Sequence, residues 1–125
     1  MPTVNPYEQY KKQSIMTMTQ GELVVQLFRG CSKHLNLAVH HMNENEIENA
    51  ESEIYKAQRI LNYLNASLDR NYEISNSLSS LYDYFIRTII KSKVKNDPDM
   101  LKEVITMVDD LGDSFQEAER IVHKK

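Results

Sequence analysis

The fold class is set by residues 47–68, which read IENAESEIYKAQRILNYLNASL. Apolar side chains recur in this stretch in alternating steps of three and four residues. The members of the stripe are Ile47, Ala50, Ile54, Ala57, Leu61, Leu64 and Leu68. This spacing places them along one narrow side of an α-helix, as in helices that pack antiparallel in a bundle. The stretch therefore predicts a long amphipathic helix in an all-α protein.

A second long helix is predicted on the N-terminal side of this stretch. Thr19 and Glu22 have the spacing of a capping box, in which the threonine hydroxyl accepts from a free backbone amide at the helix start. Apolar residues then recur at helical spacing from Leu23 onward. We expect the helix to end in the polar residues 43–45.

Two more helices are predicted towards the C-terminus. Residues 70–74 read as a loop, and Ser75 is the expected cap of the helix that follows. Asp97 and Pro98 combine a cap with a proline at the first helical position, a strong signal for a helix start. Because the connections are short, neighbouring helices should run antiparallel. The sequence predicts an all-α, antiparallel four-helix bundle over residues 19–125.

The segment ahead of the bundle, residues 1–18, forms a separate unit of the predicted organisation. Asn5 and Pro6 read as a helix start, with Asn5 as the cap. The helix that follows can hardly extend past Ser14, and so short a helix is marginal unless it docks on something. We therefore expect a short extra N-terminal helix that packs against the bundle.

Composition narrows the range of functions. The net charge of −3 provides no basic surface for a phosphate backbone, so nucleic acid is not an expected partner. No apolar run is long enough to insert into a membrane, and the first residues do not resemble a signal peptide. Cys31 is the single cysteine, which suits a reducing compartment. We therefore expect a cytoplasmic protein.

The sequence contains few candidates for catalysis or metal binding. None of the histidines follows a glutamate by three residues, the arrangement that di-iron bundles use. Cys31 and His34 are the nearest approach to a zinc-ligand pair, and such a pair on an apolar helix face more often packs in a core. The expectation is a protein that is not an enzyme and has no cofactor or metal.

A histidine phosphotransfer bundle is the alternative from another class, since it also has four helices and acts through an exposed helical histidine. His40 and His41 could serve, but neither is followed by the lysine and glycine typical of that class. Replacing His34, His40 and His41 together would separate the two functions, because only phosphotransfer requires them.

The third long helix has more apolar surface than one neighbour can cover. On a helical wheel its apolar side chains spread over roughly 240°, whereas a stripe that faces one partner needs little more than about 100°. These side chains are Leu78, Leu81, Tyr82, Tyr84, Phe85, Ile86, Ile89 and Ile90. Either this helix is central to the bundle, or part of it is a binding surface. Self-association through it, as a homodimer of the unliganded chain, is a third reading.

Five groups of motifs follow one another along nearly the whole chain in a recognisable order. They are Asn5-Pro6-Tyr7-x-x-Tyr10, Thr19-x-Gly21-Glu22-Leu23 with Leu27-Phe28-x-Gly30, Lys56-Ala57-Gln58-x-Ile60 with Leu64-x-x-Ser67-Leu68-Asp69-Arg70, Leu78-x-x-Leu81-Tyr82-Asp83-Tyr84, and Val108-x-x-Leu111-x-Asp113-x-Phe115. The fourth group is the most specific. In order and spacing, the sequence resembles the FliS family of flagellar secretion chaperones.

The resemblance implies a bacterial cytoplasmic export chaperone without catalysis. Such a chaperone holds the disordered C-terminal segment of flagellin in apolar grooves, blocks premature polymerisation and delivers the subunit to the export gate protein FlhA. It also implies an N-terminal lid that covers a groove and contacts FlhA, for which the expected residues are Tyr7, Tyr10, Ile15 and Met16. The expected groove residues are Leu78, Leu81, Tyr82, Phe85, Ile86 and Ile89.

Overall fold

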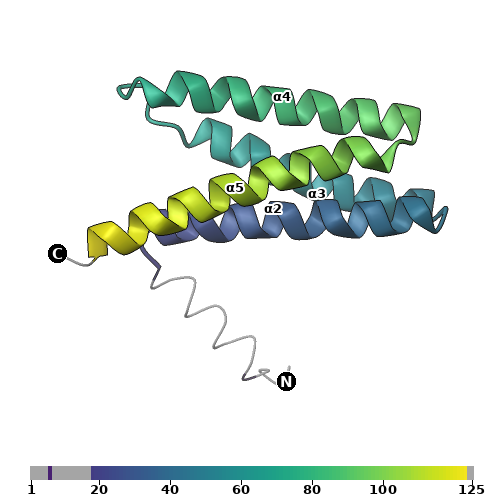
Figure 1. The fold of residues 1–125 in the computed structure, drawn as a ribbon, viewed down its shortest axis with the longest axis horizontal. Coiled ribbons are helices and arrows are strands. Elements are labelled where there is room, and N and C mark those ends of the chain that lie inside the picture. The colour runs from purple at the N-terminus through teal and green to yellow at the C-terminus, as the bar shows by residue number, and fades with distance from the viewer. Residues whose placement is uncertain (1–5, 7–17, 124–125) are drawn as a thin grey trace, which may run out of the picture.

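Four long helices make up the bundle in the computed structural model, which describes residue 6 and residues 18–123. They are α2 (Gln20–Asn43), α3 (Ile47–Ala66), α4 (Ile74–Lys95) and α5 (Pro98–His123). Successive helices reverse direction across short connections (Figure 1). The predicted all-α, antiparallel four-helix bundle is confirmed. Apart from Pro6, the extra N-terminal helix falls on residues outside those described.

The starts of α2 and α5 follow the predicted capping signals. The Thr19 hydroxyl accepts from the backbone amide of Glu22 at 3.1 Å. The Asp97 carboxylate accepts from the backbone amide of Asp99 at 3.0 Å, and Pro98 is the first helical residue of α5. In each case a side-chain oxygen binds one of the amides that a helix start leaves without a partner.

The predicted start of α4 is wrong by two residues. The helix begins at Ile74, and Glu73 occupies the cap position without a side-chain capping bond. Ser75 lies inside the first turn and is only 2% exposed. Its Oγ has no hydrogen-bond partner among the residues that the structure describes. Ser75 therefore occupies an inward-facing position of α4 instead of capping it.

The connections at one end of the bundle share a backbone design. Two left-handed asparagines close these turns, Asn45 (φ 58°) two residues after the end of α2 and Asn96 (φ 53°) directly after α4. The next residue in each turn donates its backbone amide back into the helix, Glu46 to His41 O at 2.8 Å and Asp97 to Ser92 O at 3.0 Å. These bonds satisfy carbonyl groups that the helix end would otherwise leave free. The turns therefore reverse the chain within a few residues.

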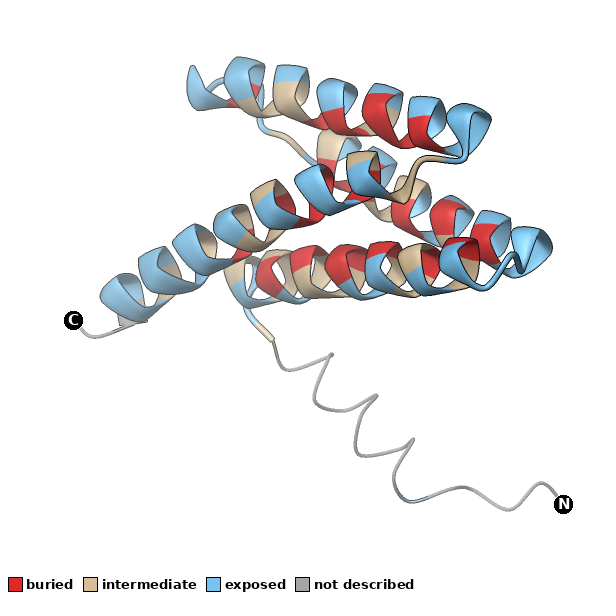
Figure 2. Ribbon diagram, turned by 45° about the vertical axis from the view of Figure 1, so that its right-hand side comes forward, coloured by how far each residue is buried: buried red, intermediate tan, exposed pale blue. Residues whose placement is uncertain are grey.

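The core is built from buried residues of all four helices, and Figure 2 marks their positions along the ribbon in red. The largest of the fully buried ones are Phe28, Leu35, Leu61, Tyr82, Phe85, Ile89, Leu101, Val104 and Val108. The ring of Phe28 on α2 lies 6.3 Å from that of Tyr82 on α4 and 5.3 Å from that of Phe115 on α5. Phe28 thus joins three helices at one level of the bundle.

The helices do not contribute equally to the packing. α2 packs extensively against both α3 and α5, whereas α4 contacts the same two helices much more sparsely. Gly112 permits part of the close α2–α5 contact, because a Cβ there would lie 3.0 Å from Arg29 Nη1 and 3.4 Å from Phe28 Cβ. The central helix is therefore α2, and α4 lies at the edge.

The stripe that identified α3 extends two residues beyond the helix itself. α3 ends at Ala66, so Leu68 belongs to the connection, yet its side chain still packs partly against the core. Within the described part of the chain, no helix is both long and apolar enough to cross a bilayer.

Candidate binding surface

Only three of the six predicted groove residues are accessible on α4. Tyr82, Phe85 and Ile89 are at most 1% exposed, and they belong to the central core. Burial raises the pKa of the Tyr82 phenol to about 12. The other three, Leu78, Leu81 and Ile86, are partly buried at the edge of the core. Contacts of a partner with α4 would therefore involve the second group.

Exposed apolar side chains also occur where the sequence analysis did not place a site. Ile90 is 45% exposed and Val94 is 79% exposed, both on the C-terminal half of α4. With Ile86 they form an i, i+4, i+8 row along one side of the helix. The row is visible in the sequence, but there it is part of a wide apolar arc, and the spacing alone does not indicate which part of that arc is exposed.

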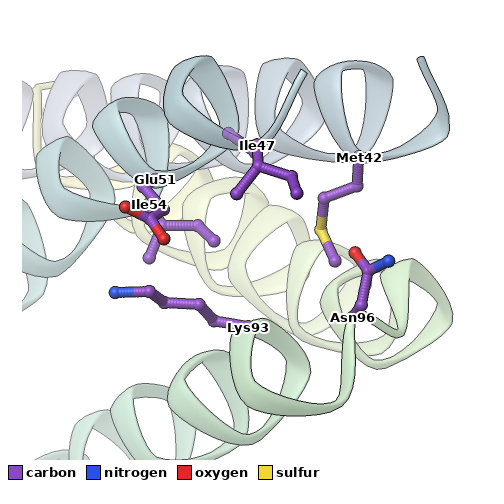
Figure 3. Close-up of a pocket in the computed structure, with 7 residues that line it drawn as sticks. Met42, Ile47, Glu51, Ile54, Lys93 and Asn96 are labelled. Carbon is purple, nitrogen blue, oxygen red and sulfur yellow. The ribbon is translucent and has the colours of Figure 1, made fainter. Parts of the chain in front are cut away.

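A pocket lies between the start of α3 and the end of α4, where Lys93 and Asn96 line it (Figure 3). Its lining includes the buried Met42, Ala50 and Ile54. Ile47 is 62% exposed at its mouth. Glu51, Lys93 and Asn96 supply the polar part, with Glu51 and Lys93 at one end of the pocket and Asn96 at the other.

We call Ile47 of α3 together with Ile86, Ile90 and Val94 of α4 the α3–α4 surface. Ile47 lines the pocket, and Ile86 is partly buried whereas the other three side chains are exposed. The surface combines apolar groups with charges of both signs, since Glu51 comes from α3 and Lys93 from α4. It exists because α4 lies at the edge of the bundle and turns only part of its apolar arc inwards. An amphipathic helix could lay its apolar side on such a surface.

A different hollow lies between α2 and α3. Leu27, His34, Lys56, Arg59, Ile60 and Tyr63 line it. The Arg59 guanidinium carbon lies 5.9 Å from the centre of the Tyr55 ring, and Tyr55 and Tyr63 are exposed on α3. This side of the bundle is thus more basic and more aromatic than the α3–α4 surface.

The cysteine and histidine considered as zinc ligands have separate environments. The Cys31 thiol is buried and donates to the carbonyl oxygen of Ala57, with 3.9 Å between sulfur and oxygen. Burial, with a smaller contribution from Asp109, raises the pKa of this thiol to about 12. His34 Nδ1 lies 2.6 Å from Glu53 Oε2 at the α2–α3 interface. Cys31 is therefore a core residue, and His34 belongs to a hydrogen bond between helices.

The predicted lid residues Tyr7, Tyr10, Ile15 and Met16 lie outside the described residues. The described chain nevertheless shows where their segment joins the bundle. The Thr19 hydroxyl donates to Glu119 Oε2 at 3.3 Å, which ties the start of α2 to the end of α5 (Figure 1). Ile121 and Val122 are exposed near this end of α5.

Comparisons with known proteins agree along most of the chain. A family model described as flagellar protein FliS matches residues 3–122. The flagellar secretion chaperone FliS of Bacillus subtilis (strain 168) is 38% identical over 118 residues, which cover 94% of this chain and 89% of that protein. The protein of the same name from Escherichia coli (strain K12) is 29% identical over 108 residues, covering 84% and 79%.

A similar fold is also found among solved structures. A crystal structure of a flagellar chaperone from bacteria superposes with a TM-score of 0.76 and covers 92% of this chain and 98% of that one. At 19% sequence identity, this likeness concerns the fold alone.

Proposed function

Because the chain belongs to the FliS family of flagellar export chaperones, we propose that it binds the C-terminal segment of flagellin on the α3–α4 surface. Binding in the cytoplasm keeps that segment from premature polymerisation. The complex is then delivered to the export gate protein FlhA. This is a binding function that requires no reactive group.

The observation that carries the proposal is the exposure of apolar side chains along α4. Ile90 and Val94 contact water on the C-terminal half of α4, where the neighbouring Phe85 and Ile89 are buried in the core. Exposed apolar groups that lie together on one surface are typical of interaction sites. A disordered segment that folds into a helix there can offset its ordering entropy by burying apolar area against these side chains.

The N-terminal segment has a place in the same proposal. It joins the bundle next to the exposed Ile121 and Val122 of α5, so it starts close to apolar surface that the bundle does not cover. We propose that Tyr7, Tyr10, Ile15 and Met16 act as a lid over a flagellin-binding groove. Flagellin would displace the lid, which would then be available to contact FlhA.

The test is a calorimetric titration with a peptide of about 40 residues from the C-terminus of the same organism's flagellin, followed in parallel by circular dichroism. We expect saturable binding, a gain of helix and a negative heat-capacity change. Val94→Asp should weaken binding at least about tenfold, since it places a charge in the proposed apolar contact. Its own stability should change by no more than about 0.5 kcal/mol, because the side chain is exposed.

Val122→Asp is the matched control, because Val122 is an exposed valine (63%) on α5, away from the α3–α4 surface. It should bind the peptide no more weakly than the native chain, because loss of a lid contact at this end of α5 could only strengthen binding. Equal losses for the two variants would show that the contact is not specific to the α3–α4 surface. A native chain and a lid-deleted chain that both fail to bind would overturn the proposed function.

A further inference from the structure

Three potential metal ligands meet where α2 turns into α3. An imidazole nitrogen of His40, one of His41 and a carboxylate oxygen of Glu46 all lie within 4.8 Å of one another. His41 Nδ1 is 3.0 Å from Glu46 Oε1, and the two imidazole ring centres are 5.4 Å apart. We infer that His40, His41 and Glu46 form a site for a divalent transition-metal ion of the zinc class.

The backbone holds these three residues together independently of any metal. His40 and His41 are in the last turn of α2, and Asn45 reverses the chain through its left-handed conformation. The Glu46 amide then donates to the His41 carbonyl oxygen at 2.8 Å. Because this hydrogen bond fixes the turn, the ligands on its two sides lose little conformational freedom when an ion binds.

Glu46 is an unusual residue for the position it occupies. It is the N-cap of α3, where serine, threonine, aspartate and asparagine are preferred, and its side chain makes no capping bond. The carboxylate instead points back to His41 across the turn. The Glu46 carboxylate does not cap α3 and instead lies near two imidazoles. Together the three side chains provide the mixed nitrogen and oxygen ligands that zinc accepts.

The distances suit such an ion after small side-chain rotations. Zinc bonds to nitrogen and oxygen of about 2.0–2.1 Å in a tetrahedral arrangement place neighbouring ligand atoms about 3.3 Å apart. The His41–Glu46 contact at 3.0 Å is already close to this spacing. His40 and Glu46 are exposed, so a water molecule can complete the coordination.

The surrounding charge also favours a cation. Residues 44–53 contain five glutamates and no lysine or arginine. The C-terminal end of α2 adds the negative end of its helix dipole. An ion pair between His41 and Glu46 would explain why these two side chains are in contact. It would not explain why a nitrogen of His40 also lies close to both of them.

The test is a titration of the full chain, without a histidine tag, with zinc chloride, monitored by calorimetry and by the histidine ring signals in NMR spectra. We expect one zinc ion per chain, with shifts at His40 and His41. His41→Ala and Glu46→Gln should each weaken zinc binding at least about tenfold, since even outer-shell partners of metal ligands contribute that much. Magnesium should not compete, because it prefers all-oxygen ligand sets.

His34→Gln is the matched control, because His34 is paired with a carboxylate but belongs to no group of three potential metal ligands in the described part of the chain. It should bind zinc with unchanged affinity. Circular dichroism of each variant verifies that the bundle is intact, and His40→Ala provides a further variant outside the ion pair. Absence of saturable zinc binding would overturn the inference, as would undiminished binding by the His40, His41 and Glu46 variants.

Discussion

At the scale of single residues, the α2–α3 interface contains a carboxylate between two basic side chains. Glu53 lies 2.6 Å from His34 Nδ1 and 3.5 Å from Lys56 Nζ. Burial by itself would raise the pKa of Glu53, but the hydrogen bond from His34 and the charges of Lys56 and His34 lower it below its usual value. The folded state therefore favours the ionised form of this side chain.

A carboxyl group with a lowered pKa in the folded state stabilises the fold at neutral pH. That contribution is present above the pKa of the unfolded chain and is lost as the pH falls through the folded-state pKa. Glu53→Gln should therefore reduce the free energy of unfolding by about 1–2 kcal/mol at pH 7. The difference from the native chain should shrink in acid, as urea denaturation over a series of pH values would show.

The exposed Glu51, half a turn earlier on α3, is the control for this effect. Glu51→Gln should leave the pH profile of stability close to that of the native chain. A Glu53→Gln variant whose stability loss stays the same down to the most acidic pH would contradict the assigned cause.

The buried thiol permits a second prediction at this scale. Because the pKa of Cys31 is raised to about 12, almost no thiolate is present near neutral pH, and the thiolate is the reactive form. We expect Cys31 to resist a chromogenic thiol reagent in the folded chain and to react fully in urea. An exposed thiol introduced as Ser52→Cys should react at once, whereas rapid labelling of folded Cys31 would contradict the burial.

At the scale of the elements, the turns after α2 and α4 depend on asparagine in a left-handed conformation. Asn96 follows α4 with φ 53°, and the amide after it closes the turn onto Ser92. A Cβ makes this conformation costly for most residues, whereas glycine and, to a lesser degree, asparagine tolerate it. The same turn positions Asn96 in the lining of the α3–α4 pocket.

Asn96→Ala should consequently lower the free energy of unfolding by about 1 kcal/mol. Asn96→Gly should be neutral or slightly stabilising, because glycine adopts the left-handed region without a penalty. Thermal or urea denaturation measures both. Asn62, exposed in the C-terminal part of α3, is the control, and Asn62→Ala should not destabilise, because alanine is the better helix former. Equal effects of alanine at the two positions would contradict the argument.

At the scale of the whole molecule, three helices pack closely and the fourth, α4, lies at the edge with fewer contacts. α2 joins α3 and α5 into a firm core, and α4 completes the bundle with fewer contacts. The edge helix can therefore expose apolar side chains without weakening the centre. The N-terminal segment joins the bundle at the end where α2 begins beside the end of α5. The turns after α2 and α4 are at the other end of the bundle (Figure 1).

Removing residues 1–18 tests the proposed lid. If the lid is closed about 90% of the time, flagellin binding is weakened about tenfold, so the deletion should tighten it by that factor. Titration of the deleted and full chains with the same flagellin peptide measures the difference. Replacing Tyr7 and Tyr10 by serine should reproduce most of the gain, whereas serine at Lys11 and Lys12 should not. Unchanged or weaker binding by the deleted chain would contradict the lid.

Much of the architecture was predictable because it depends on local patterns. Three signals depend only on residues that are close together in the sequence. They are the apolar stripe of residues 47–68, the Thr19 capping box and the Asp97-Pro98 helix start. Each of these signals can be recognised in the sequence alone, and the structure confirms a helix for each. The cap predicted at Ser75 failed because the same serine also suits an inward-facing position, and only the packing of α4 shows which of the two it occupies.

The sequence by itself determined the all-α class, the number of long helices in the bundle, most of their ends and the likeness to an export chaperone family. Tertiary structure alone decided that α2 is central and α4 lies at the edge, that Tyr82, Phe85 and Ile89 are core, and that Ile90 and Val94 contact water. Helical periodicity reports which side of a helix is apolar, but not how much of that side its neighbours cover. Coverage depends on how far apart the helices lie and how they cross, and these follow from contacts between residues that are distant along the chain.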